Sequence, residues 1–364
     1  MKNGKWLYIS GSLALCLSSP ALAAEDFQVR YNLAGSLGGE IFAPPVKSGW
    51  GGGIALTRVS VDKVTGGDGN PITQPIPGGV VSVPGAPSFA YPTYGKNTAT
   101  LVSGGSLNIY NVAIGYLSTE FAPGERFAFL ATVPYGRKDQ RIDAVASTPA
   151  LNYPAPAAYS PAQRSAIESQ FGVGYQRQLG AAAGPQNGIV SGVGDVELQG
   201  GWLLERARWR VLTGVALVLP TGKYSSASGP DIGYGNFYTL RPSIQASYQA
   251  TEKVGLAGKL SFGFNSRNRD SGVRSGNWAS LEGAAAYMTP IGPIGLHAVY
   301  VDQFQDDKGN VFGPARFKTS NAGAFFTTKL PGADGAVTLQ IMRTVSSRYA
   351  KAGSFAQVRA VFFF

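Results

Sequence analysis

Thiol chemistry and long apolar runs are nearly absent from this chain of 364 residues. It has one cysteine, Cys16, one histidine, His297, and only 3 methionines. Because Cys16 lies within residues 1–23, which we expect to be removed, the rest of the chain can form no disulfide, thiolate nucleophile or cysteine metal site. A single histidine also leaves a histidine-based metal site without a second ligand. Beyond residue 23, no run of about 18 apolar residues predicts a transmembrane helix.

The beginning of the chain has the pattern of a secretory signal peptide. Lys2 and Lys5 give a positive start, an apolar stretch follows at 6–17, and Ala21-Leu22-Ala23 forms an A-x-A cleavage site. The apolar stretch is shorter than the about 20 residues that a membrane-spanning helix needs. We therefore expect residues 1–23 to be a signal peptide.

Glycine and aromatic residues are abundant, with 49 Gly, 17 Tyr and 19 Phe. Apolar and polar residues alternate with period two over segments of about ten residues, which is typical of strands that cross a membrane as a barrel. The pattern predicts an all-β fold, a transmembrane antiparallel up-and-down β-barrel of about 12 strands of the bacterial outer-membrane type. The expected strands span 52–63, 106–118, 126–138, 193–205, 207–219, 238–250, 254–265, 278–288, 294–304, 316–329, 336–344 and 354–363.

Short and long connections alternate between these strands, as an up-and-down barrel requires. The short ones carry turn residues, for example Ala122-Pro123-Gly124. We expect the barrel to occupy residues 51–364, with long extracellular loops at 64–105 and 141–192 and both ends of the chain in the periplasm. Residues 24–50 form either a periplasmic segment or a plug.

One part of the second long loop carries a helix signal. Ser160 can cap a helix that begins at Pro161, and Ile167 and Phe171 recur four residues apart. The pattern predicts a short helix over 161–170. The surrounding segment, 144–188, is either a surface loop with a helical turn or a gate in the mouth of the barrel.

The two faces of each predicted strand differ in polarity. Apolar faces must meet lipid, because an Arg or Lys at mid-bilayer costs about 2–4 kcal/mol there. The opposite, lumen-facing side chains are the candidates for substrate binding: Asp195, Glu197, Arg208, Arg210, Arg241, Gln245, Lys259, Glu282, His297 and Arg359. Two interpretations stay open, that these groups pair across the lumen and brace the barrel, or that they line a conduit.

Several short motifs occur together. Gly192-Val193-Gly194-Asp195 opens a strand, and the basic segment Arg206–Arg210 leads to Leu219-Pro220-Thr221-Gly222. With Gly51-Gly52-Gly53-Ile54-Ala55, these motifs resemble the outer-membrane family named for the meta-pathway of phenol degradation. The resemblance implies a barrel found with aromatic-compound catabolism that moves such compounds across the outer membrane. It assigns no binding residue.

The expected function is therefore an outer-membrane channel or transporter for passive uptake of small hydrophobic or aromatic compounds. The alternative is a structural or surface-binding barrel that acts through its long loops. We expect no enzyme, because there is no G-x-S-x-G element and His297 has no evident nucleophile, and we expect no cofactor or metal. A net charge of +10 could indicate binding to nucleic acid, but an exported barrel does not meet nucleic acid as its normal partner. We therefore expect no nucleic-acid partner.

The last strand indicates further partners. Its alternation places Val358, Ala360, Phe362 and the terminal Phe364 on the lipid face. The expected partners are outer-membrane lipid, a small organic solute, and the barrel assembly machinery, which would recognise the C-terminal strand ending at Phe364.

Overall fold

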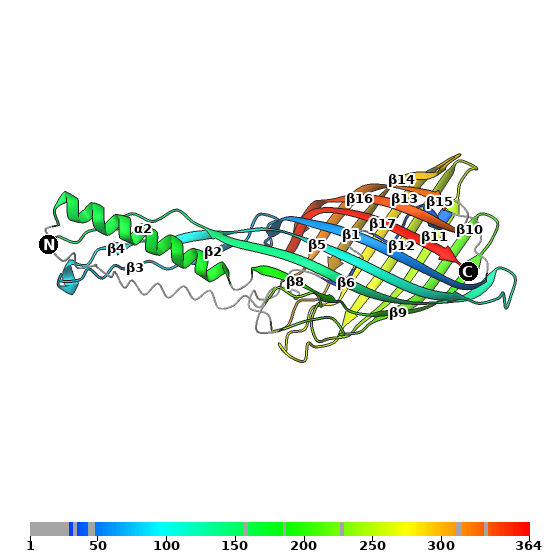
Figure 1. Cartoon of the computed structure of the whole chain (residues 1–364), viewed down its shortest axis with the longest axis horizontal. Helices are drawn as coiled ribbons and strands as arrows, with labels where there is room; N and C mark the ends of the chain where they lie inside the picture. Colours follow the sequence, from blue (N-terminus) through cyan, green and yellow to red (C-terminus); the bar gives the residue numbers. More distant parts are fainter. Residues whose placement is uncertain are drawn as a thin grey trace.

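The computed structural model describes residues 29–31, 35–42, 48–155, 159–184, 187–225, 229–309, 315–330 and 334–364. Within these residues one antiparallel sheet contains 14 strands, of which β2 and β8 are short additions and the other twelve close into a barrel (Figure 1). The barrel closes where β5 pairs with β1 on one side and with β6 on the other. The predicted signal peptide lies outside the described residues.

The elements follow one another along the chain in a simple order. The barrel strands are β1 (Gly49–Thr65), β5 (Asn97–Leu117), β6 (Glu125–Val145), β9 (Glu197–Glu205), β10 (Trp209–Val218), β11 (Thr239–Gln249), β12 (Val254–Asn265), β13 (Trp278–Thr289), β14 (Gly292–Gln303), β15 (Lys318–Lys329), β16 (Gly335–Arg348) and β17 (Ala350–Phe363). The other elements are η1 (Gly39–Phe42), β2 (Thr73–Ile76), β3 (Gly79–Val80), η2 (Ser88–Ala90), β4 (Thr93–Tyr94), β7 (Leu151–Asn152), α2 (Pro161–Ala183) and β8 (Gly188–Val193).

The predicted barrel and its strands are confirmed, and β12 has the predicted range. Two differences concern the neighbours of β6. The strand expected at 193–205 is divided into β8 and β9 at Gly194-Asp195-Val196, beside Pro134, which has no N–H to donate to the ladder. In addition, β5 and β6 have 21 residues each, because they continue beyond the barrel.

Short turns join the strands at one end of the barrel, which we call the turn end; the C-terminus also lies there (Figure 1). Gly124, in the turn between β5 and β6, has φ +69°, and a side chain at this position would collide with the carbonyl oxygen of Glu205. Glycine is therefore required in this turn. The opposite end, from which β5 and β6 project, is the loop end.

Side chains alternate between the outer surface and the lumen. On β12, Leu256 and Phe264 are exposed on the outside, whereas Ser261 and Asn265 are buried inside. Aromatic residues collect on the outer surface near the turn end, where Trp209 stacks on Tyr248 with ring centroids 4.4 Å apart. Such a girdle is typical of the membrane interface of barrels.

No helix among the described residues is long and apolar enough to span a membrane.

The part of the chain beyond the loop end forms what we call the extension, composed of β2, β3, β4, β7, the outer parts of β5 and β6, and α2 (Figure 1). The predicted start of the helix is confirmed, since Ser160 and Gln163 form a capping box and Pro161 is the first helical residue. The helix continues to Ala183, further than the predicted residue 170. It buries a stripe at four-residue spacing, Ile167, Phe171, Tyr175, Leu179 and Ala183. Much of the segment expected as loop therefore has regular structure and an apolar core.

Candidate functional site

The lumen contains a cavity of about 920 Å³. Part of its wall is a row of small residues that face each other across six consecutive barrel strands, from β6 to β13. The row consists of Ala128, Gly201, Gly214, Ser243, Ser261 and Ser280, each paired in register with the next. With strands about 4.8 Å apart, the row extends over about 24 Å of the wall. We call it the small-residue row; all its members line the cavity.

Close packing of the backbone requires some of these small residues. Gly214 and Gly201 are opposite each other on β10 and β9. A Cβ atom at Gly214 would collide with the carbonyl oxygen of Gly200 and with the Cα atom of Gly201. The wall therefore carries no side chain at these two positions.

Larger side chains lie on both sides of the small-residue row. Toward the turn end the inward positions are Leu203, Leu212, Gln245, Lys259 and Glu282, which are also in register. Toward the loop end, Arg241 forms an ion pair with Glu197. The cavity is thus lined by small and apolar residues together with a few charged groups, which is a typical composition for a small-molecule site.

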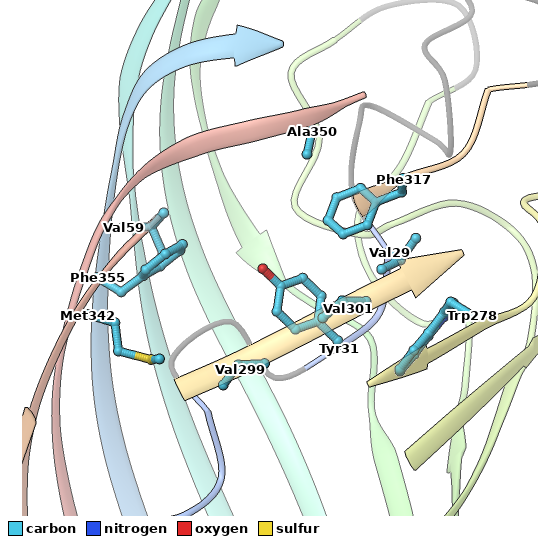
Figure 2. Packing of buried hydrophobic residues seen from close by; sticks show 10 residues of the cluster. All are labelled: Val29, Tyr31, Val59, Trp278, Val299, Val301, Phe317, Met342, Ala350 and Phe355. Carbon is cyan, nitrogen blue, oxygen red and sulfur yellow. The ribbon is translucent and has the colours of Figure 1, made fainter. Parts of the chain in front are cut away.

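The N-terminal segment, residues 29–31 and 35–42, lies inside the barrel against the opposite wall. Val29 and Tyr31 pack in a cluster with Trp278, Val301 and Phe317 (Figure 2). Leu37 and Ile41 pack against Phe325 and other residues of the wall. The apolar side of this segment thus packs on β13–β16.

Arg30 holds the first part of this segment. Its guanidinium forms an ion pair with Asp195 at 2.8 Å, and these side chains are only 2% and 5% exposed. It also donates hydrogen bonds to the carbonyl oxygens of Phe237 (2.5 Å) and Gly235 (3.1 Å), and it lies 3.9 Å from the centroid of the Phe237 ring. Asp195 accepts two further bonds, from the backbone N–H groups of Gly222 (3.0 Å) and Tyr234 (3.1 Å).

Further polar contacts hold the rest of the segment, and two of them involve carboxylates. Ser36 donates its backbone N–H to Glu282 at 2.6 Å and its hydroxyl at 3.0 Å. Glu40 forms an ion pair with Arg359 and accepts a bond from Thr338 at 2.8 Å. The lumenal charges are therefore divided between contacts within the wall and contacts to the N-terminal segment.

A protein-family model described as "Putative MetA-pathway of phenol degradation" matches residues 90–360. The chain belongs to this family. The predicted resemblance is confirmed, and the protein is an outer-membrane β-barrel of the phenol-degradation family.

One solved structure supports the fold. An outer membrane channel from Pseudomonas putida F1 aligns with a TM-score of 0.59 at 13% identity, covering 88% of this chain and 97% of that one. The toluene transporter TodX of Pseudomonas putida gives a TM-score of only 0.33 at 12% identity, over 88% of this chain and 89% of TodX. No curated protein sequence matches the chain.

In this family member, seven of the predicted lumenal residues line the cavity: Asp195, Glu197, Arg241, Gln245, Lys259, Glu282 and Arg359. Two others also point inward but are covered by the N-terminal segment. Arg210 donates to the carbonyl oxygen of Ile41 at 3.0 Å and pairs with Glu205 at 2.9 Å. His297 is buried next to Gly35.

The prediction for Arg208 is wrong. The hairpin between β9 and β10 closes through reciprocal backbone bonds of Arg206 and Trp209. Arg208 therefore lies in the turn and is exposed, rather than on an inward position of a strand.

His297 has a structural environment. Its Nδ1 atom lies 2.9 Å from Nε2 of Gln340, and its ring meets the edge of Phe325 with centroids 5.8 Å apart. Within the described residues, it forms no hydrogen bond to a hydroxyl group or a carboxylate. Those residues also contain no group of three His, Cys, Asp or Glu side chains suited to a metal ion.

Sequence reasoning missed two parts of the site. The connection from β10 to β11 folds into the cavity, where Tyr224, Ile232 and Tyr234 line it. The small-residue row was also not predicted. Its signal is present in each strand as a small inward residue, but only the register places these residues side by side.

Proposed function

We propose that the protein is a passive outer-membrane channel for small hydrophobic or aromatic organic compounds. The observation that carries this proposal is the cavity of about 920 Å³ beside the small-residue row. A cavity of about 150 Å³ is already large enough to bind benzene. The lumen therefore has room for an aromatic molecule with substituents, together with water.

The chemistry of the lining supports the same class of solute. Leu203, Leu212 and Val218 offer apolar contacts, and Arg241 and Lys259 offer hydrogen-bond donors to a polar substituent. Lys259 donates to Ser36 at 3.0 Å, which uses one of its three N–H groups. A hydroxyl or carboxylate group on an aromatic ring fits such donors.

We further propose that residues 24–50 act as a plug rather than as a periplasmic segment. In its described part this segment has several polar contacts to the wall, among them those of Arg30, Ser36 and Glu40, and a buried apolar side, including Leu37. The solute then passes between the plug and the small-residue row.

Blocking the row tests the proposal. Ser243→Phe places a ring in the cavity, whereas Ile244→Phe places the same ring on the lipid face, where Ile244 is 49% exposed. Each protein is reconstituted into vesicles, and entry of radiolabelled benzoate is measured against empty vesicles, because a charged aromatic crosses lipid slowly.

We expect wild-type and Ile244→Phe proteins to admit benzoate at similar rates and Ser243→Phe to admit it nearly as slowly as empty vesicles. Equal entry through all three proteins would contradict a route along the row. No entry above empty vesicles for the wild type, with benzoate and with uncharged aromatics, would contradict the channel itself.

The alternative, a surface-binding barrel, is favoured by the extension, which has its own apolar core around Phe171 and Tyr175. If binding to a cell-surface partner were the function, replacing residues 148–186 by a short linker would abolish that binding. Benzoate entry in the same variant distinguishes the two functions, because the small-residue row remains intact.

A further inference from the structure

The outer surface of the barrel near the loop end carries exposed arginines at related positions. They are Arg58 on β1, Arg137 on β6 and Arg343 on β16, which we call the arginine arc. Along each strand toward the loop end, the arginine is the first charged residue to follow the exposed apolar ones, and on β16 one more exposed apolar residue, Val345, comes after it. The arginine follows the exposed Leu56 on β1, Tyr135 on β6 and Ile341 on β16 at two-residue spacing. The arc therefore lies at the border of the lipid-facing surface.

The arc is contiguous around the barrel. The sheet order is β16, β17, β1, β5, β6, so the arginines occupy alternate strands. Arg58 is opposite Asn108, which is opposite Arg137, and Arg343 is opposite Ser354, which is opposite Ser60. Arginines two strands apart have backbones about 10 Å apart. The strands between them present only short side chains at these positions.

The arginines lack the partners that charged groups have elsewhere on the same border. Among the described residues, the side chains of Arg58 and Arg137 have no hydrogen bond or ion pair. Arg343 has only a distant contact, 3.8 Å, to Asp62, and its side chain is 78% exposed. On β15, the strand next to β16, by contrast, Lys318 is paired with Asp302 at 3.2 Å.

Nearby acids compensate only part of the charge. Asp139 is paired with Arg141 at 3.2 Å, outside the arc. Guanidinium groups prefer phosphate oxygens, which they bind through two parallel hydrogen bonds. At the border of the bilayer, the phosphates available are those of lipid head groups.

We propose that the arginine arc binds the phosphate groups of a phosphorylated glycolipid in the outer leaflet of the outer membrane. The ligand class follows from the exposed guanidinium groups, of which only that of Arg343 has an acidic neighbour, and from their place at the edge of the apolar surface. The site is independent of the lumen, so it does not depend on what the channel carries.

Binding of purified protein in detergent to lipopolysaccharide tests this proposal, with retained lipid counted by native mass spectrometry. The test variant combines Arg58→Gln, Arg137→Gln and Arg343→Gln. The control combines Arg164→Gln, Arg177→Gln and Arg208→Gln, which removes the same charge from exposed positions outside the arc. Heat-modifiable migration on gels shows that each barrel is folded.

We expect the arc variant to bind about a hundredfold more weakly, since each basic residue near an anionic surface contributes about fivefold. The control should stay within about twofold of the wild type, as surface charges away from the site contribute little. Wild-type protein should also prefer the phosphorylated lipid over the same lipid after dephosphorylation. Equal losses in both variants, no loss in the arc variant, equal binding of the dephosphorylated lipid, or displacement by millimolar inorganic phosphate would each overturn the proposal.

Discussion

Replacing Arg30 by alanine should release the N-terminal segment from the lumen. Arg30 makes the ion pair with Asp195 and donates to two carbonyl groups and to the hydroxyl of Thr239. All these bonds join the segment to the wall or to the β10–β11 connection. Other polar contacts of the segment do not use this side chain. They include bonds from Arg241 to the carbonyl oxygen of Arg30 and from Asn321 to the hydroxyl of Tyr31, and those of Ser36 and Glu40 further along.

The size of the effect follows from the burial of the pair. Removing one partner of a buried ion pair costs about 3–5 kcal/mol. Asp195 keeps the N–H groups of Gly222 and Tyr234, so the carboxylate is not left bare, and the lower limit applies. A loss of about 3 kcal/mol corresponds to an about 150-fold increase in the population of the released segment.

Thiol labelling measures this population. Leu37 is 1% exposed and lies in the same segment, and no other cysteine is expected in the mature chain. The labelling rate of Leu37→Cys is compared in the wild-type background, with Arg30→Ala, and with Arg177→Ala as a control on the exposed surface of α2. If labelling requires release, the rate should rise by about two orders of magnitude with Arg30→Ala and stay unchanged with Arg177→Ala.

Conductance of single channels in a planar bilayer gives an independent measure. Arg30→Ala should lengthen the time spent at high conductance if the segment obstructs the lumen. Faster labelling with unchanged conductance would refute the plug but keep the anchoring role of Arg30. An unchanged labelling rate would refute the reasoning on the ion pair itself.

Further predictions concern other parts of the molecule. Phe171→Ala should destabilise the extension by about 3–5 kcal/mol, because it removes a buried ring, and limited proteolysis should then cut α2 while the barrel keeps its heat-modifiable migration. Ser160→Ala should cost the same helix about 1 kcal/mol through loss of its cap, and proteolysis of α2 should accelerate by about fivefold. Deletion of Phe364, which is 74% exposed, should slow insertion into outer-membrane vesicles that contain the assembly machinery and leave spontaneous folding into detergent unchanged; equal slowing in both would contradict recognition of this residue.

The strands could be predicted because their signal is local. Alternation along β12 is visible in twelve consecutive residues, and it also assigns Lys259 and Ser261 to the lumen. The error at Arg208 has a local cause as well. The alternation of inward and outward side chains holds from Trp209, where β10 begins, but not for Arg208, which lies in the turn before it. The start of α2 was predictable from Ser160 and Pro161, but its end was not, because the stripe continues to residues whose partners come from β2–β4.

The contents of the lumen could not be predicted in the same way. Arg30 and Asp195 are 165 residues apart, and Ser36 and Glu282 are 246 apart. No pattern along the chain joins such pairs; they meet only because the barrel closes around the segment. The small-residue row likewise depends on five strand registers at once, although each of its members is an ordinary inward residue in its own strand.

A barrel of twelve strands has a lumen of intermediate width. About eight strands give a barrel filled by its own side chains, and about sixteen give a water-filled channel. In this protein the two halves of the lumen differ. Opposite the N-terminal segment, the wall of β14–β17 offers Val299, Phe325 and Met342, which fill space and pack. On the other side, the small-residue row leaves the cavity unfilled. The same barrel can therefore hold its N-terminal segment firmly and still keep a passage for a solute beside it, because packing residues and small residues occupy different parts of the wall. On β13, for example, Ala284 packs with the segment, whereas Ser280 lines the cavity.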